Sequence, residues 1–387
     1  MKLRIMYLKI IFILSLAGSL FTAIKIGNFS LSAAITFSAL LFPLFFIKTV
    51  IQKKTILLIF PFLLYCIYDF SSFFWGPITK SVLQDFTVWT GMLLLFLISS
   101  NPSNNLSDNI IKIMDISKYP FLLLLTYFFL KGIDSPATMM LTVLYFSYFL
   151  AKFISKRILF FEILIMIYLF MVPIVTGSRI IYISEIIILF IFITFFYGNK
   201  YSIKDKFKKI MFITFSTFII LMIAFAFQDK INAVMSKGDA ANVGGITVNT
   251  SGRTYIWSIV LKSAQNNILF GLGQDGPPEM LKYPKWAHPH NDYLRLLHHN
   301  GIIGLVLWLL FFINLLIYLL NRIKYSSNDY YKSYYLFNFI FLFAILIIMI
   351  TDNPIVYSYI MYPLMILSGS SIALHDIEKK NMIKKDI

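Results

Sequence analysis

One histidine-rich segment carries most of the side chains that could transfer a proton. Four of the five histidines lie within residues 288–299, and nine residues separate His290-Asn291 from Gly301-Ile302-Ile303-Gly304. Histidine is the side chain whose pKa best suits proton transfer near neutral pH, and only 13% of the chain is charged. If this protein catalyses a reaction, we expect the chemistry at this segment.

Two arginines follow short polar tripeptides that are typical of helix starts. Thr176-Gly177-Ser178 precedes Arg179, and Thr250-Ser251-Gly252 precedes Arg253, with Trp257 one turn further on. A helix N-terminus presents unpaired N–H groups and the positive end of the macrodipole, so an arginine beside it favours phosphate or pyrophosphate. The alternatives are that Arg179 is an interfacial arginine and that Arg253 is a solvated loop residue.

The neighbouring residues also allow simpler interpretations. His290 could be a structural histidine that bonds loop carbonyls, and a zinc site with His288 is disfavoured because Pro289 restricts the geometry and no clear third ligand accompanies the pair. We expect His298 and His299 on a helix surface. Gly301 and Gly304 are expected to stop and restart a helix with close backbone packing.

The composition places these residues in a membrane. The chain has 387 residues, 59% of them hydrophobic, whereas soluble domains carry roughly 25% charged residues. The net charge of +16 comes from basic residues in alternate short connections, as the positive-inside rule requires. No contiguous basic patch interleaved with aromatics is present, which argues against a nucleic-acid partner.

The apolar runs predict an all-α integral membrane protein with about 12 transmembrane helices and one large extracytoplasmic loop, 229–301, that contains short helices. The predicted spans are 5–24, 29–48, 55–71, 82–98, 119–132, 137–152, 158–176, 180–197, 210–228, 302–320, 333–351 and 355–373. We expect residues 1–387 to form a single membrane domain with both termini cytoplasmic, and we expect the first span to be an uncleaved helix rather than a signal peptide.

Four carboxylates lie in or near the apolar runs and are candidates for function by default. Asp69 and Asp352 fall near span ends, where they could be wet, and Glu162 lies near the cytoplasmic boundary. Glu185 lies about 9 Å below Arg179 at the rise of an α-helix and is expected to pair with a basic side chain.

Together these motifs resemble the O-antigen ligase and O-antigen polymerase superfamily. The resemblance rests on Ser178-Arg179, Ser251-Gly252-Arg253 with Trp257, the Gly271/Gly273 turn, and His290-Asn291 followed by Gly301-x-x-Gly304. It covers roughly residues 176–310, while the N-terminal half matches in hydropathy and span count alone.

The resemblance implies a metal-independent, inverting glycosyltransferase that needs no cofactor and works on the periplasmic side of the bacterial inner membrane. The donor would be an oligosaccharide on undecaprenyl diphosphate. Arg179 and Arg253 would bind the donor pyrophosphate, and His290 would activate or orient the acceptor hydroxyl. Asn291 and Trp257 are further candidates for substrate binding.

The acceptor decides between the members of this superfamily. A polymerase extends a lipid-linked repeat unit, a ligase uses lipid A-core, and a protein-directed relative uses a serine. We favour the polymerase, with the ligase as the alternative, and whether a chain-length regulator binds is open. A competing class is a transporter or flippase for the same lipid-linked sugar, which would place its polar residues near the bilayer midplane.

Overall fold

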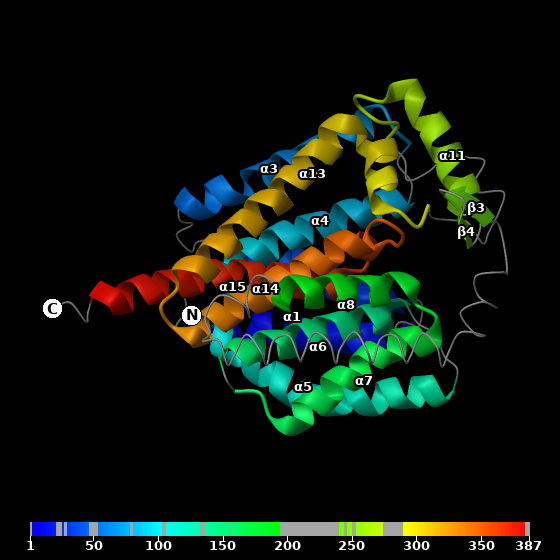
Figure 1. Ribbon diagram of the computed structural model, residues 1–387. Coiled ribbons are helices and arrows are strands. Elements are labelled where there is room, and N and C mark those ends of the chain that lie inside the picture. Colours follow the sequence, from blue (N-terminus) through cyan, green and yellow to red (C-terminus); the bar gives the residue numbers. More distant parts are fainter. Residues whose placement is uncertain are drawn as a thin grey trace.

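The computed structural model is a bundle of long helices whose two termini lie at the same end (Figure 1). It describes residues 2–20, 25–26, 29–45, 53–77, 80–102, 106–131, 136–155, 157–193, 240–243, 246–249, 253–273 and 289–383. The first half contains α1 (Lys2–Leu20), β1 (Lys25–Ile26), β2 (Phe29–Ser30), α2 (Leu31–Leu44), α3 (Lys53–Ser71), η1 (Ser72–Phe74), α4 (Lys80–Ser99), α5 (Leu106–Leu130), α6 (Pro136–Ile154), α7 (Phe160–Thr176) and α8 (Arg179–Ile191). The second half contains β3 (Ala240–Val243), β4 (Ile246–Asn249), α11 (Arg253–Ala264), η3 (Gln265–Asn267), α13 (Asp292–Tyr325), α14 (Asp329–Ile348), η5 (Pro354–Val356) and α15 (Ser358–Ile383).

Six of the described helices are long and apolar enough to cross a membrane. They are Lys53–Phe74, Val82–Ser99, Leu106–Leu130, Asp292–Tyr325, Asp329–Ile348 and Ser358–Met382. Ala34–Leu44, Thr138–Ile154 and Phe160–Thr176 are shorter apolar helices. The predicted span 210–228 lies outside the described residues, and each other predicted span overlaps a described helix. The helical membrane architecture is therefore confirmed, while the number of crossings stays a prediction.

The fifth predicted span differs from the structure at its start. The sequence suggests an amphipathic connection over 99–118 before a short span, but α5 is one continuous helix of 25 residues. Its polar residues Asp115 and Lys118 are held by ion pairs with α6 and α7, so they do not need water to solvate them. Pro120 lies inside the helix without ending it.

Aromatic packing joins the helices that carry the candidate site. The rings of Phe62 in α3 and Phe311 in α13 stack with centroids 4.8 Å apart, and Tyr65 meets Trp89 of α4 and Trp308 of α13 edge-on at 5.0 and 5.2 Å. In a bilayer such close contacts take the place of the hydrophobic driving force that packs helices in water. They hold α3, α4 and α13 as one unit.

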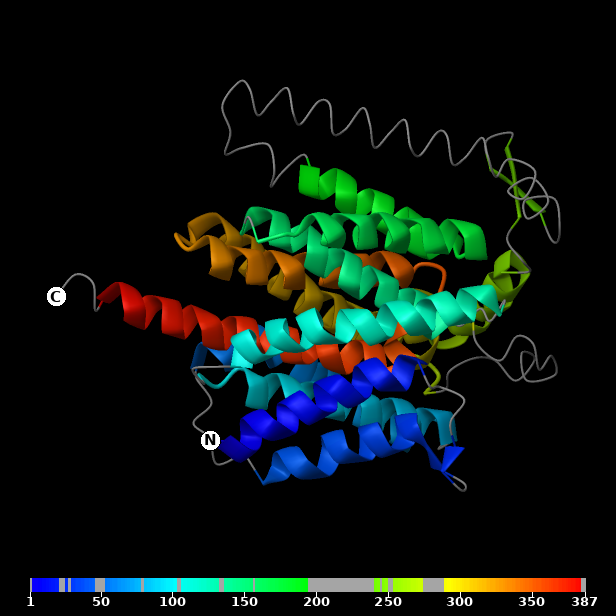
Figure 2. The same cartoon turned by 90° about the horizontal axis from the view of Figure 1, so that it is seen from below.

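The extramembrane elements gather at the end of the bundle away from the termini. The β3–β4 hairpin and α11 lie there, as does the β1–β2 hairpin near the start of α2 (Figures 1 and 2). Figure 1 also shows α13 sharply bent, with its first turns at an angle to the rest of the helix and close to α11. This bend is the structural starting point of the candidate site.

Candidate functional site

The bend in α13 is a true interruption of the helix at Gly301. Its backbone has φ 64° and ψ −169°, a region that only glycine adopts readily. The stretch before it begins where the Asn291 side chain accepts a hydrogen bond from Leu294 N at 3.0 Å, which caps the helix. The expected stop and restart of the helix at Gly301 is confirmed, and the first helical residue is Asp292.

The segment after α11 supplies the hydrogen bonds that the broken helix lacks. Leu272 N and Gly273 N donate to the carbonyls of His298 and His299 at 2.8 and 2.9 Å. In return, Ile302 N and Ile303 N donate to the carbonyls of Ile268 and Leu269, at 2.8 and 3.3 Å. The two segments cross so closely that a Cβ added to Gly271 or Gly301 would lie within 2.6 Å of backbone atoms of the other segment. The crossing fixes α11 against the start of α13 and explains the glycines of the motif.

Trp257 strengthens the same junction. Its indole Nε1 donates to the carbonyl of Pro289 at 2.8 Å, and the neighbouring Ile256 and Val260 of α11 pack against Leu294 of α13. A hydrogen bond from the indole ring to the residue just before His290 fixes the distance between α11 and the histidine. The structure thus gives Trp257 a positioning contact, and its predicted contact with substrate stays a prediction.

His290 occupies an unusual backbone conformation at the tip of this junction. Its φ is 47°, and it is the non-glycine residue with positive φ among the described residues. Left-handed conformations cost energy for residues with a Cβ and concentrate at functional sites, where the surroundings hold them in place. The buried Nδ1 of the ring lies 3.7 Å from Asp352 Oδ1, and 40% of the side chain is exposed. The Nδ1 side of the ring therefore faces the Asp352 carboxylate, and part of the ring stays exposed.

Asp352 reaches His290 because the turn between α14 and α15 is bonded to the start of α13. Asp292 N donates to the carbonyl of Met349 at 2.9 Å, and Asp292 Oδ2 accepts from Ile355 N at 3.0 Å. These bonds lie on either side of Asp352 in the sequence and hold its turn against the helix that begins after His290. The sequence predicted that Asp352 lies near the end of a span, where water could reach it. Hydropathy gives no information on the distance between Asp352 and His290.

Arg253 lies within electrostatic reach of both Asp352 and Arg179. Burial lowers the pKa of the Arg253 guanidinium below its ordinary value, the charge of Asp352 raises it, and the charge of Arg179 lowers it further. Arg179 and Arg253 are therefore within electrostatic reach of each other. Each is the first residue of its helix, as predicted, although Ser178 at the N-cap of α8 makes no side-chain capping bond. The structure thus brings Arg179, Arg253, His290 and Asp352 to one end of the bundle.

Two other histidines are placed differently from the prediction. His298 and His299 were expected on a helix surface, but they are 0% and 1% exposed. His298 Nε2 lies 3.0 Å from Ser263 Oγ of α11, and His299 Nε2 lies 3.0 Å from Asp69 Oδ1 of α3. The surface expectation is wrong because α3 and α11 both pack against this short stretch of α13, which a hydrophobicity pattern cannot show.

Asp69 is the centre of this buried network. Its Oδ1 also accepts from Asn300 Nδ2 at 2.8 Å, and Asn300 Oδ1 accepts from the hydroxyl of Tyr65 at 3.0 Å. Arg295 pairs with Asp85 of α4 a turn away. These polar contacts fix the turns of α13 that precede the break, so the site rests on the rigid membrane helices rather than on a loop alone.

The remaining intramembrane carboxylates have structural partners. Glu162 pairs with Lys118 and Lys152. Glu185 is buried and accepts a hydrogen bond from Thr142 Oγ1 at 3.2 Å, so within the described part of the chain its expected basic partner is absent. The described residues also hold no group of three or more metal-binding side chains, while His288 lies outside them.

One comparison with known proteins finds a similarity to a family over part of the chain. Residues 164–309 match the family described as O-antigen ligase, and no curated protein matches the chain. The matched range begins in α7, ends in α13 and contains Arg179, Arg253 and His290. The resemblance to the O-antigen ligase and polymerase superfamily is confirmed over these residues.

Proposed function

Because residues 164–309 resemble the O-antigen ligase and polymerase superfamily, we propose that this protein is a membrane glycosyltransferase of surface polysaccharide synthesis. It transfers an oligosaccharide from undecaprenyl diphosphate to a glycan acceptor. The observation that carries the proposal is the convergence of two helix-start arginines, a strained histidine and a carboxylate at one end of a membrane bundle.

The arginines suit the leaving group of such a reaction. As the bond between the anomeric carbon and the diphosphate oxygen breaks, negative charge grows on the lipid diphosphate. Arg179 and Arg253 stabilise this charge, together with the positive macrodipole ends at the starts of α8 and α11. Burial is the main reason for the lowered pKa of Arg253, and the charge of Arg179 lowers it further, so an anion between the two arginines relieves their repulsion. This arrangement supplies the positive charge without a metal.

His290 is the general base in this proposal. The acceptor hydroxyl attacks the anomeric carbon from the face opposite the diphosphate, so a new glycosidic bond forms as the old bond breaks, with inversion. The proton of the hydroxyl passes to the open edge of the His290 ring. Asp352, at 3.7 Å from Nδ1, orients the ring and stabilises the imidazolium that results. Asp352 acts through His290 and is therefore a positioning residue.

The acceptor defines the two forms of the proposal. As a polymerase, the favoured form, the enzyme joins one lipid-linked repeat unit to another. As a ligase, the alternative form, it joins the finished polymer to lipid A-core, and the family match is compatible with both forms. In both forms the enzyme lies in the bacterial inner membrane with cytoplasmic termini and a periplasmic site. A chain-length regulator would be a partner of the polymerase form.

Deletion of the gene in its host separates the forms. Surface lipopolysaccharide is run on a gel, with plasmid copies of the wild type and of His290→Ala as complements. A core that carries a single repeat unit supports the polymerase, and a bare core with polymer accumulating on the carrier lipid supports the ligase. A ladder that is unchanged by the deletion would contradict the proposed pathway.

A further inference from the structure

The end of the bundle opposite the proposed catalytic site contains a separate cavity. It has a volume of about 590 Å³ and lies between the start of α5, the turn into α14 and the last turns of α15. The C-terminus lies at this end in Figure 1. Ligand pockets in proteins commonly have volumes of about 300 to 1,000 Å³, so the cavity is large enough for a small polar group and the atoms attached to it.

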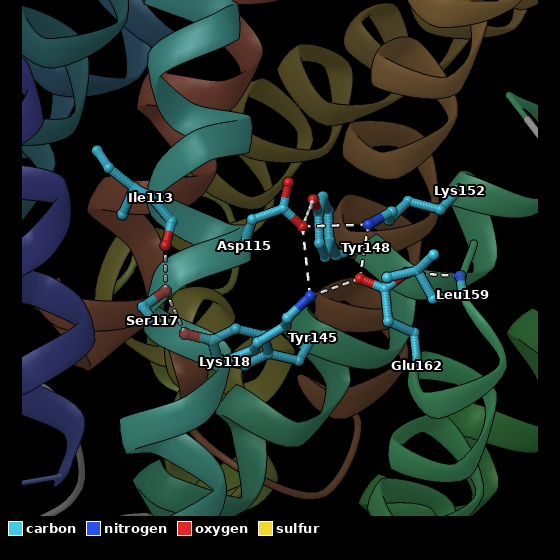
Figure 3. Close-up of polar contacts among 9 residues, drawn as sticks. All are labelled: Ile113, Asp115, Ser117, Lys118, Tyr145, Tyr148, Lys152, Leu159 and Glu162. Atoms are coloured by element: carbon cyan, nitrogen blue, oxygen red, sulfur yellow. Dashed lines mark hydrogen bonds and ion pairs between the residues drawn. The ribbon is translucent and has the colours of Figure 1, made fainter. Parts of the chain in front are cut away.

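The carboxylates that line the cavity are already engaged. Asp108 Oδ1 accepts a hydrogen bond from the hydroxyl of Tyr330 at 2.5 Å. Asp115 Oδ1 accepts from the hydroxyl of Tyr148 at 2.8 Å and from Lys152 Nζ at 3.1 Å (Figure 3). Lys152 neutralises Asp115, whereas Asp108 keeps one negative charge because a tyrosine hydroxyl is neutral.

A neutral ion cluster lies directly behind Asp115. Lys118 and Lys152 both contact Glu162 Oε1, at 2.5 and 2.7 Å, and both lie within 4 Å of Asp115 (Figure 3). Lys118 and Glu162 are 5% and 1% exposed. Two lysines and two carboxylates thus cancel one another, and burial this deep requires that they do. The cluster joins α5, α6 and α7 and contributes no net charge to the cavity.

The cavity also has two basic side chains that the cluster does not neutralise. Lys112 and Arg157 line it, and both are exposed. Arg157 lies over the face of the Tyr330 ring, with its guanidinium carbon 4.9 Å from the centroid. In the described part of the chain neither residue pairs with a carboxylate within 4 Å. Lys112 and Arg157 carry two positive charges against the single negative charge of Asp108, so the net charge of the lining is positive.

The rest of the lining suits a molecule that is polar at one end and apolar at the other. Ile111, Leu374 and Ile377 provide apolar surface, and Tyr330 and Tyr331 are amphipathic residues that are enriched at membrane interfaces. The cavity lies where a membrane helix ends, and not at its middle, so the headgroup layer of the bilayer is beside it. A soluble anion has no apolar part that could pack against this apolar wall.

We propose that this cavity binds an anionic phospholipid of the leaflet that faces the termini. Its phosphate contacts Lys112 and Arg157, and its glycerol and first acyl carbons lie against Ile111 and Leu374. Basic side chains at a membrane surface attract anionic lipid with about 1 kcal/mol each. The site is independent of the proposed glycosyl transfer, since it lies at the other end of the bundle.

Lipid binding to the purified full-length protein tests this site. The delipidated protein in detergent is titrated with phosphatidylglycerol, phosphatidylcholine with the same acyl chains, or inorganic phosphate, and bound lipid is counted by native mass spectrometry. The variant Lys112→Ala/Arg157→Ala is compared with Lys324→Ala/Lys380→Ala, which removes two exposed basic residues near the same end but outside the cavity lining. A second pair, Lys112→Gln/Arg157→Gln, removes the charge but keeps a polar side chain in case the alanine variant does not fold.

We expect the cavity variant to bind phosphatidylglycerol about 30-fold more weakly than the wild type, from about 1 kcal/mol for each lost basic side chain. The matched control should bind nearly as tightly as the wild type. Equal loss in both variants would mean that general surface charge attracts the lipid, and would overturn the site. Equal binding of phosphatidylcholine would overturn the preference for an anionic lipid. Retention of inorganic phosphate without retention of phosphatidylglycerol would assign the site to a free anion and overturn the lipid proposal.

Discussion

Replacing Gly301 by alanine is expected to disrupt the crossing on which the candidate site rests. At φ 64° and ψ −169° an added Cβ would meet Leu269 O at 2.3 Å and Gly271 N at 2.6 Å. These are backbone atoms that cannot rotate away as the end of a side chain could. Either Gly301 must change its conformation or the segment after α11 must move away from α13.

The expected cost has two parts. A residue with a Cβ in this region of φ and ψ costs about 1 to 3 kcal/mol. Separation of the two segments would also break four backbone hydrogen bonds, which link Leu272, Gly273, Ile302 and Ile303 to their partners. At about 0.5 to 1.5 kcal/mol each, these contribute roughly 2 to 6 kcal/mol. Gly301→Ala should therefore lower stability by about 3 to 9 kcal/mol, which is the sum of both parts.

Gly177→Ala is the matched control, because Gly177 also has a positive φ, of 80°, but nothing lies within 4 Å of its added Cβ. It should cost only about 1 to 2 kcal/mol for the left-handed backbone. Both variants are compared with the wild type by thermal unfolding in detergent and by hydrogen exchange of Leu272 and Gly273. Equal destabilisation by the two substitutions, with exchange at Leu272 and Gly273 unchanged, would refute the proposed crossing.

Three further substitutions or treatments test the chemistry. Asp352→Asn should lower kcat by up to about 100-fold with little change in KM, because it loses the charge that orients His290; a change in KM alone would contradict this role. Arg253→Lys keeps the charge but loses the forked donor, and should weaken transfer by roughly 10- to 150-fold, or about 1.5 to 3 kcal/mol, in a kinetic assay with lipid-linked donor. Activity equal to the wild type would show that Arg253 acts as a point charge or not at all. Chelation with EDTA should leave transfer unchanged because Arg179 and Arg253 supply the positive charge, and a loss that is restored by a divalent metal would contradict that explanation.

The sequence predicted the helices better than their ends. Runs of about 20 apolar residues mark membrane helices because the backbone must satisfy its own hydrogen bonds in lipid. The start of α5 escaped prediction because Lys118 is neutralised by Glu162 of another helix, and hydropathy cannot detect a partner that is distant in the sequence. Residues 210–228, the ninth predicted span, lie outside the described part of the structure.

The site was predictable where local patterns determine it. Small polar residues before Arg179 and Arg253 indicated helix starts, and both arginines do begin helices. The break at Gly301 was also readable from the sequence, because glycine permits conformations that other residues avoid. Asp352 was not assigned to the site because its contact with His290 depends on a turn between α14 and α15, 62 residues further along the chain.

Glycan transfer by the purified protein is the most direct test of the central claim. The wild type, His290→Ala and His375→Ala are reconstituted into liposomes with an undecaprenyl-diphosphate-linked oligosaccharide and an acceptor, and the glycan product is quantified. His375 is a matched control because it lies near the C-terminal end of α15, outside the proposed site. We expect transfer by the wild type and by His375→Ala, and a loss of at least about 100-fold in His290→Ala. Transfer by His290→Ala at the wild-type rate would contradict the role of His290 as the catalytic base.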